Sequence, residues 1–323
     1  MEIGLALPQY DYSVPGQDQV DWPTLVDAAT RAERLGFSSL WLADHLSMSI
    51  EKYGGPPGEH RGFDPIEALA GLAQHTTTAK LGTLVICCQL RPPTVLAKQL
   101  AGIDLITGGR LIAGLGAGWN EPEYREAGVP FHRPGRRLQE LQTAIEQIRR
   151  VWDPNDEGTP CRPPPRQQPN GPPIWVGGKG DRLLDLVAQQ ADGWNTVWAW
   201  THRDYAERLK ALEAACERRS RDPATITRSV GLYALIGENE ADLARRFDLL
   251  QRLTPPGVLD GVGFDAWRTG RLVGTVEQVR EQLEQWQELG VAHVIAGLGA
   301  VPFAMTTPDD LEMVASATVL GAV

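Results

Sequence analysis

A regular alternation of apolar runs and amphipathic segments restricts the fold of this chain more than any other feature. The runs are short and rich in Leu, Ile and Val, as buried parallel strands are, and the segments between them repeat apolar residues at helical spacing. Strands are predicted in this way at residues 2–9, 38–43, 80–88, 110–118, 174–176, 192–198, 228–236 and 291–298. So many strand–helix units favour an α/β protein of the closed (β/α)8 TIM-barrel type over a doubly wound open sheet.

Helices are predicted between and after these strands, at residues 21–35, 64–78, 92–107, 136–152, from 181 onward, 203–219, 239–253, 275–290 and 308–319. Residues 119–136 and 254–273 are predicted to be irregular insertions, and the proline-rich stretch 153–172 is predicted to be a connector. We expect a single domain over residues 1–323, with the insertions at the carboxyl ends of the strands, where barrels place their chemistry.

The composition of the chain argues against some classes of binding partner. The formal net charge of −10 argues against nucleic acid or an anionic membrane surface as a general ligand. No apolar run approaches the roughly 20 residues that span a bilayer. The chain starts directly in a strand without a basic leader, and its cysteines lack metal-ligand spacing. We therefore expect a cytoplasmic protein without a metal site that acts on a small molecule, and we leave open whether it forms a homodimer.

A glycine-rich turn follows the strand at 174–176. Gly177, Gly178, Lys179 and Gly180 precede a helix that starts at Asp181. Glycines let the backbone approach a ligand closely, and the amino end of a helix offers free N–H groups and a positive dipole. Lys179 adds a positive charge. The turn is predicted to bind phosphate; a tight turn whose glycines serve only packing is the alternative.

Two further patterns stand at the ends of predicted strands. Asp44 and His45 follow Trp41-Leu42-Ala43, so both emerge at the carboxyl end of a strand. An imidazole there suits proton transfer or donation to a ligand ring, although it could also simply hold the following loop; Asp44 is better suited to orienting backbone. Gly114, Gly116 and Gly118 alternate along one strand, where either another backbone or a flat ligand must lie close.

Five segments, in order, resemble the bacterial luciferase-like superfamily: WLADHL, LGTLVICC, GRLIAGLGAGWNEPEYREAGVPF, PPIWVGGKG and ADGWN. Members of this superfamily are flavin monooxygenases and oxidoreductases that use a deazaflavin, coenzyme F-420. The resemblance covers nearly the whole chain. It implies a (β/α)8 barrel that holds the flavin or deazaflavin ring at the carboxyl ends of its strands.

The resemblance also implies a set of cofactor-binding residues. Ala43 and Asp44 would flank the pyrimidine side of the ring, and the bond between Leu84 and Val85 matches the position where the family often has a non-prolyl cis peptide. The full set implied is Ala43, Asp44, Thr83, Leu84, Val85, Gly116, Asn120, Gly177, Gly178, Lys179 and Gly180.

The chain departs from its deazaflavin-dependent relatives at two places. Trp119 occupies the position where some of them have an acidic residue, and a Trp that they place after the Asp-His pair is replaced here by one of Ser47, Met48 and Ser49. An acid–base role cannot be transferred from those relatives, so His45 is the one remaining catalytic candidate.

We predict an oxidoreductase that moves a hydride between coenzyme F-420 and a small organic substrate. The alternative is an FMN-dependent monooxygenase that uses oxygen and reduced flavin; a barrel that binds a phosphorylated metabolite without redox chemistry is a third hypothesis. Lys179 and Arg182 slightly favour the more anionic deazaflavin. The predicted pocket loops are 46–62, 119–134, 198–202 and 254–272. An apolar or aromatic substrate is suggested by the aromatic residues on these loops, Trp119, Phe131, Trp198, Trp200, Phe264 and Trp267.

Overall fold

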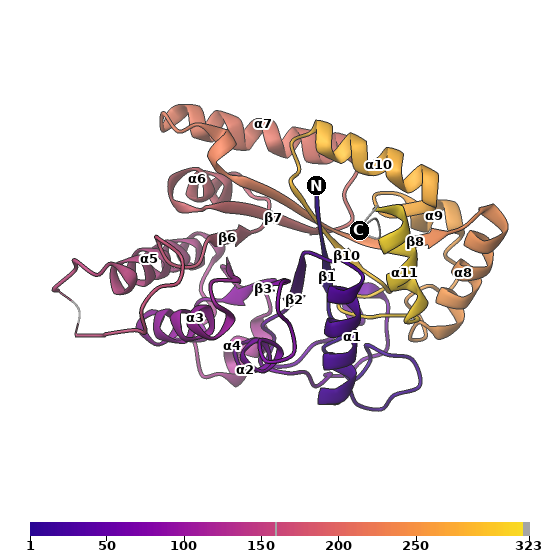
Figure 1. Cartoon of the computed structure of the whole chain (residues 1–323), viewed down its shortest axis with the longest axis horizontal. Helices are drawn as coiled ribbons and strands as arrows, with labels where there is room; N and C mark the ends of the chain where they lie inside the picture. Colours follow the sequence, from indigo (N-terminus) through magenta and orange to yellow (C-terminus); the bar gives the residue numbers. More distant parts are fainter. Residues whose placement is uncertain (159, 319–323) are drawn as a thin grey trace.

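The structure, a computed structural model, describes residues 1–158 and 160–318 and has a closed parallel barrel at its centre (Figure 1). The barrel strands are β1 (Glu2–Ala6), β2 (Ser39–Leu42), β3 (Lys80–Thr83), β5 (Leu111–Gly116), β6 (Ile174–Gly177), β7 (Gly193–Trp198), β8 (Thr227–Gly237) and β10 (His293–Gly297). Each pairs with the next in this order, and β10 pairs with both β8 and β1, which closes the ring. The predicted (β/α)8 barrel is confirmed.

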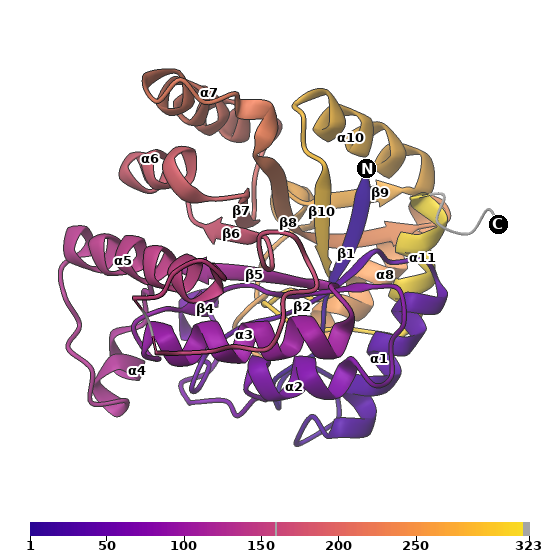
Figure 2. The same cartoon turned by 60° about the vertical axis from the view of Figure 1, so that its left-hand side comes forward.

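Helices surround the barrel, as Figures 1 and 2 show. They are α1 (Trp22–Arg34), α2 (Pro65–Leu72), α3 (Pro93–Thr107), α5 (Pro134–Trp152), α6 (Asp181–Gln190), α7 (His202–Arg218), α8 (Glu240–Leu253), α10 (Val276–Glu288) and α11 (Asp309–Ala317). A short 3-10 turn, η2 (Pro223–Thr225), precedes β8. Within residues 1–158 and 160–318, no helix combines the length and apolar character that a membrane span requires.

Several helix boundaries follow from capping side chains. The Asp21 carboxylate accepts the N–H of Thr24 and starts α1, as predicted. Thr275 and Gln278 form a reciprocal capping box at the start of α10. The helix predicted at 64–78 is too long, because α2 ends at Leu72. The carboxylate of Glu33 on α1 accepts the N–H groups of residues 77–79, which takes this stretch out of the helix.

The strand predicted at 80–88 is interrupted. β3 ends at Thr83, and the short β4 (Ile86–Cys87) pairs separately with β5. The bond between Leu84 and Val85 is cis, as the resemblance implied. A second non-prolyl cis bond joins Val197 to Trp198.

Both predicted insertions contain regular structure that the sequence did not indicate. Residues 119–136 include α4 (Glu121–Glu126) and the first turn of α5; Figure 2 shows α4 outside the ring of helices, on the side of β4. Residues 254–273 include α9 (Phe264–Arg268) and the start of β9 (Leu272–Thr275), which extends the sheet beyond the barrel by pairing with the end of β8. β9 leads directly into α10; its first two residues were predicted as part of the insertion, and Thr275 as the start of that helix. The predicted connector includes residue 159, and the predicted closing helix ends at residue 319. Both residues lie outside the part of the chain that the structure describes.

Large side chains fill the interior of the barrel below the carboxyl ends of its strands. The rings of Trp41 and Trp175 lie 5.2 Å apart. Both are buried with Ile112 and Ile295 in one apolar cluster. At the same level the hydroxyl of Ser39 bonds the buried His293 ring at 2.7 Å. This packed layer is the floor on which a carboxyl-end site can stand.

Candidate active site

A cavity of about 560 Å³ opens at the carboxyl ends of β2, β3, β5, β6 and β7. Its volume lies in the range of small-molecule and cofactor sites. It is lined by side chains and backbone from these strand ends and the loops after them: Asp44, His45, Met48, Lys52, Tyr53, Leu84, Val85, Ile86, Cys87, Gly116, Ala117, Gly118, Trp119, Glu123, Gly177, Gly178, Lys179, Leu183, Asn195, Thr196, Val197, Trp198, Trp200, Pro302 and Phe303.

Most of the residues predicted from the sequence meet in this cavity: Asp44, His45, Leu84, Val85, Gly116, Gly177, Gly178 and Lys179. The others, Ala43, Thr83, Asn120 and Gly180, stand beside it. The backbone of Ala43 is bonded on both sides by the amide of Gln9. The hydroxyl of Thr83 bonds both the N–H and the carbonyl of Gly114. Ala43 and Thr83 therefore hold the strand ends together, and their role toward a cofactor stays a prediction.

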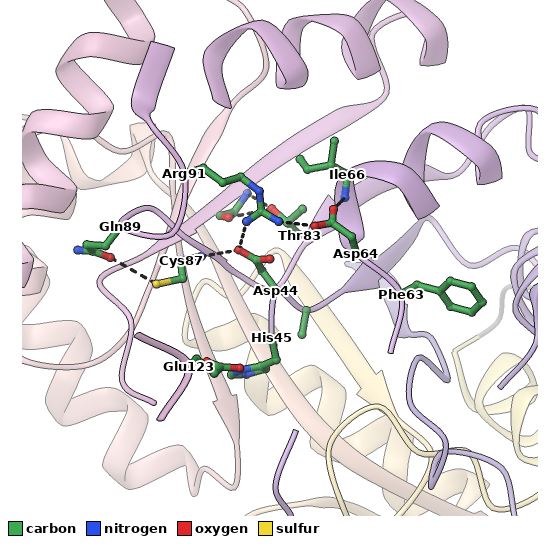
Figure 3. Close-up of polar contacts among 12 residues, drawn as sticks. Asp44, His45, Phe63, Asp64, Ile66, Thr83, Cys87, Gln89, Arg91 and Glu123 are labelled. Atoms are coloured by element: carbon green, nitrogen blue, oxygen red, sulfur yellow. Dashed lines mark hydrogen bonds and ion pairs between the residues drawn. The ribbon is translucent and has the colours of Figure 1, made fainter. Parts of the chain in front are cut away.

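Asp44 belongs to a charged network behind the cavity (Figure 3). Its Oδ2 accepts the N–H of Cys87 at 3.0 Å and Nη1 of Arg91 at 2.5 Å. Arg91 also donates Nη2 to Asp64, which caps α2. Burial raises the pKa of Asp44, and the hydrogen bond from Arg91 opposes that rise. Asp44 thus ties β2 to the segment after β3, in agreement with the expectation that it orients backbone. No sequence pattern indicated Arg91.

His45 has an acidic partner that the sequence analysis missed. Its Nδ1 lies 2.8 Å from Oε1 of Glu123, and Figure 3 shows the two side chains meeting on the opposite side of Asp44 from Arg91. Glu123 is only 4 % exposed and comes from α4. The edge of the His45 ring also packs against Trp119, with centroids 5.5 Å apart. An acidic side chain therefore does lie beside His45, but it comes from α4 and not from position 119. The signal available in the sequence was a Glu that comes to lie beside a strand end once residues 121–126 form a helix.

The alternating glycines of β5 are explained by packing. A Cβ on Gly116 would come within 2.5 Å of Cγ2 of Val85, and one on Gly177 within 2.9 Å of its Cγ1. A Cβ on Gly114 would overlap the carbonyl of Thr83. The missing side chains therefore let the segment 83–85 lie against two strands, so that Val85 projects into the cavity between Gly116 and Gly177. The alternation was predicted to make room either for another backbone segment or for a flat ligand. The first explanation holds for Gly114.

The glycine turn has open donors at its end. Gly178 is used by the fold, because its N–H donates to Asn195 and its carbonyl accepts Nε1 of Trp194. The N–H groups of Lys179 and Gly180 have no acceptor among the described residues. No side chain caps α6 after them, and the first N–H groups of a helix have no partner within it. An anion fits here, with the helix dipole and Lys179 contributing positive potential.

Aromatic side chains wall the cavity. Trp198 stacks on Tyr233 at 5.2 Å and meets Phe303 edge-on at 5.4 Å. Of the six aromatic residues on the predicted pocket loops, Trp119, Trp198 and Trp200 line the cavity. The other three do not line it: Phe131 packs on Tyr124, and Phe264 and Trp267 pack on Phe247. These rings cover α4 and α8, whose apolar faces need a partner. The apolar or aromatic character of the substrate stays a prediction.

The fold and the site define a (β/α)8 barrel with a cavity at the carboxyl ends of its strands and open backbone N–H donors at the start of α6. Among the described residues, no group of three or more His, Cys, Asp or Glu could hold a metal ion. The chain belongs to the luciferase-like monooxygenase family, whose model matches residues 1–293, and it is an oxidoreductase of that family.

Two mycobacterial relatives are each 29 % identical to this chain. The phthiodiolone/phenolphthiodiolone dimycocerosates ketoreductase of Mycobacterium tuberculosis matches over 273 residues, 76 % of this chain and 69 % of its own. The F420-dependent hydroxymycolic acid dehydrogenase of the same species matches over 320 residues, 92 % of this chain and 82 % of its own.

Solved structures share the fold at low sequence identity. An F420-dependent secondary alcohol dehydrogenase, in complex with an F420-acetone adduct, has a TM-score of 0.76 at 16 % identity, covering 100 % of this chain and 99 % of that one. The long-chain alkane monooxygenase LadA has a TM-score of 0.79 at 14 % identity, covering 98 % and 90 %. At these identities the likeness supports the barrel alone.

Proposed function

We propose that this protein is a deazaflavin-dependent oxidoreductase that interconverts a carbonyl group and an alcohol on a small organic substrate. The observation that carries the proposal is the pairing, within one cavity, of an acid–histidine pair with an uncapped helix end beside Lys179. The names of the two mycobacterial relatives, a ketoreductase and an F420-dependent dehydrogenase, support the same chemistry.

Different residues of the cavity would bind the phosphate and the ring of the cofactor. The free N–H groups of residues 179–182 would hold a phosphate, and Lys179 would neutralise part of its charge. Leu84 and Val85 would support one face of the ring, because both line the cavity. When bound, the deazaflavin would supply or accept the hydride at its C5 position.

His45 would handle the proton that accompanies the hydride. Its Nδ1 is held by Glu123, which leaves Nε2 for the oxygen of the substrate. In the reducing direction His45 would donate a proton to the carbonyl oxygen as the carbon gains the hydride, and in the oxidising direction it would accept the proton of the alcohol. The carboxylate of Glu123 would fix the orientation of the His45 ring through its contact with Nδ1.

The second candidate function is an FMN-dependent monooxygenase. The uncapped end of α6 and Lys179 would accept the single phosphate of FMN equally well, and the family includes monooxygenases by name. The two functions differ in how fast the complex with the reduced cofactor reacts with oxygen.

Cofactor titration separates the two functions. Purified protein is titrated with oxidised coenzyme F-420 and with FMN, followed by absorbance, and each reduced complex is then mixed with oxygen. We expect tighter binding of F-420, slow oxidation by oxygen, and anaerobic hydride transfer to a ketone or aldehyde. Tight FMN binding, with oxygen consumption coupled to product formation, would instead establish the monooxygenase.

A further inference from the structure

Lys52 is a cation in the cavity that the proposed hydride chemistry does not use. It lies on the short 3-10 turn η1 (Glu51–Tyr53), in the loop that follows β2. Its Nζ stands 3.1 Å from the centroid of the Trp119 ring and 4.9 Å from that of Tyr53. Within the described chain, this Nζ forms no hydrogen bond and no salt bridge; its contacts are with the two aromatic rings.

The turn that carries Lys52 is firmly held. Ile50, just before it, is fully buried in the apolar cluster that includes Tyr233. Gly54, just after it, has a φ of +88°, and a Cβ there would come within 2.9 Å of the carbonyl of Gly257. Further along, Met48 and His60 exchange backbone hydrogen bonds of 3.0 and 2.9 Å. Lys52 is therefore kept at the cavity wall by its buried neighbours.

The ammonium group of Lys52 stands at the cavity wall without an acidic partner. Lys52 is an exposed residue, yet partial desolvation by the surrounding side chains lowers the pKa of its ammonium group to about 8, although the charge of Glu123 opposes this. The Trp119 ring gives the ammonium group a cation–π contact. The carboxylate of Glu123 is already bonded to His45. A cation that lines a ligand cavity, and that no carboxylate of the described residues pairs with, is available to an anionic group of the ligand.

The position of Lys52 assigns it to the substrate rather than to the cofactor. The donors that fit the cofactor phosphate come from β6 and α6, whereas Lys52, His45 and Trp119 come from the loops after β2 and β5. Lys52 stands over the same Trp119 ring whose other neighbour is His45. A substrate whose oxygen meets His45 would therefore lie on the same side of the cavity as Lys52.

We propose that Lys52 binds an anionic group of the substrate, so that the substrate is a small carbonyl compound or alcohol that also carries a carboxylate, on an apolar or aromatic frame. The carbonyl part rests on the proposed function; the anion site does not. Lys52 is thus a residue that determines which substrate is accepted.

The test compares benzoate with benzamide, its neutral near-isostere, by calorimetric titration of the whole chain with and without bound F-420. We expect the unmodified protein to bind benzoate about ten-fold or more tightly than benzamide, as for a charge-assisted hydrogen bond. Lys52→Met should abolish this preference and Lys52→Arg should keep most of it. Lys210→Met, on the exposed face of α7, is the matched control and should leave it unchanged.

Two more variants locate the anion. Trp119→Leu removes the aromatic platform but keeps the ammonium, so the preference for benzoate should persist. At a saturating concentration of F-420, which would occupy the phosphate turn, Lys179→Met should also leave the preference intact. A preference that Lys179→Met removes and Lys52→Met retains would place the anion at the phosphate turn and overturn the proposal. Equal binding of benzoate and benzamide by the unmodified protein would do the same.

These outcomes are independent of the proposed hydride chemistry, because no turnover is measured. If the protein prefers FMN, the carboxylate preference and its loss in Lys52→Met still stand. If F-420 binds and ketones are reduced but benzoate has no advantage, the anion site fails while the function holds. A thermal melt of Lys52→Met and Lys52→Arg shows that each variant is folded.

Discussion

The carboxylate of Glu123 and Nδ1 of His45 are 2.8 Å apart, although 78 residues separate them in the chain. His45 leaves the barrel at the end of β2, and Glu123 enters from α4 after β5. β2, β3 and β5 are consecutive neighbours in the barrel, so two loops that are distant in sequence share one rim. The pair places a group that can carry a proton beside a buried carboxyl group that fixes the orientation of its ring.

Removal of either member of the pair should slow the chemical step more than it weakens cofactor binding. We expect His45→Ala to lower turnover by roughly 10²–10⁴-fold, as for loss of a general acid or base. Glu123→Gln keeps a hydrogen-bond partner but removes the charge, so its loss of turnover should be smaller. Single-turnover reduction, cofactor titration and thermal melting measure these effects; unchanged single-turnover rates in a folded His45→Ala variant would refute the proton-transfer role.

At the amino end of α6, one substitution should have opposite effects on the stability of the protein and on cofactor binding. Gly180 is the N-cap, with extended backbone (φ −74°, ψ 148°), and a Cβ at this position would meet no other atom within 4 Å. Gly180→Asp should therefore cap the helix and leave stability unchanged or slightly raised, by a few tenths of a kcal/mol. Its negative charge should repel the cofactor phosphate and weaken cofactor binding by about ten-fold or more.

The neutral variant Gly180→Asn is the matched control, because it caps the helix without the charge. It should bind the cofactor more tightly than Gly180→Asp does. Equal cofactor affinity in Gly180→Asp and the unmodified protein would remove this turn from the site. Gly178 is unsuited to the test, since its φ of +139° and a Cβ within 2.7 Å of Leu183 would strain any substituted side chain.

Gly116 and Val85 should be energetically coupled. A Cβ on Gly116 would meet Cγ2 of Val85 at 2.5 Å, so Gly116→Ala should lower the free energy of unfolding by about 1–3 kcal/mol through overpacking. Val85→Ala removes the methyl groups in question, and the double variant should regain part of that loss. Urea unfolding of the two single variants and the double variant gives the coupling energy; strictly additive effects would show that the contact carries no strain.

Binding of a carboxylate should weaken as the pH rises through the pKa of Lys52. That pKa is lowered to about 8, so the ammonium is charged below this pH and neutral above it. We expect the advantage of benzoate over benzamide to fall between about pH 7.5 and 9.5, with the bound anion moving the midpoint upward. Glu123, His45 and Tyr53 also face Lys52. All three residues are retained in Lys52→Arg, so in this variant the advantage of benzoate over benzamide should stay constant over this pH range. If that advantage falls in Lys52→Arg as it does in the unmodified protein, a group other than Lys52 is titrating.

The barrel was predictable because its determinants are local and repeated. Apolar runs at strand spacing, helical periodicity and caps such as Asp21 and Thr275 each lie within a few residues, so they can be recognised from the sequence. The glycine turn before α6 was predicted in the same way. The structure shows which N–H groups of the turn are available: the N–H of Gly178 is bonded within the protein, and the open donors begin at Lys179.

Local patterns in the chain were enough to predict the (β/α)8 barrel and the rim on which a site must lie. Which charges meet at that rim became visible only in the folded chain: Glu123 with His45, Arg91 with Asp44, and Lys52 with no anionic partner among the described residues. Each of these residues lies on a loop or short helix, and the path of such a segment depends on packing against other loops. Periodicity fixes the strands and helices, but contacts between insertions depend on long-range packing that no local pattern encodes.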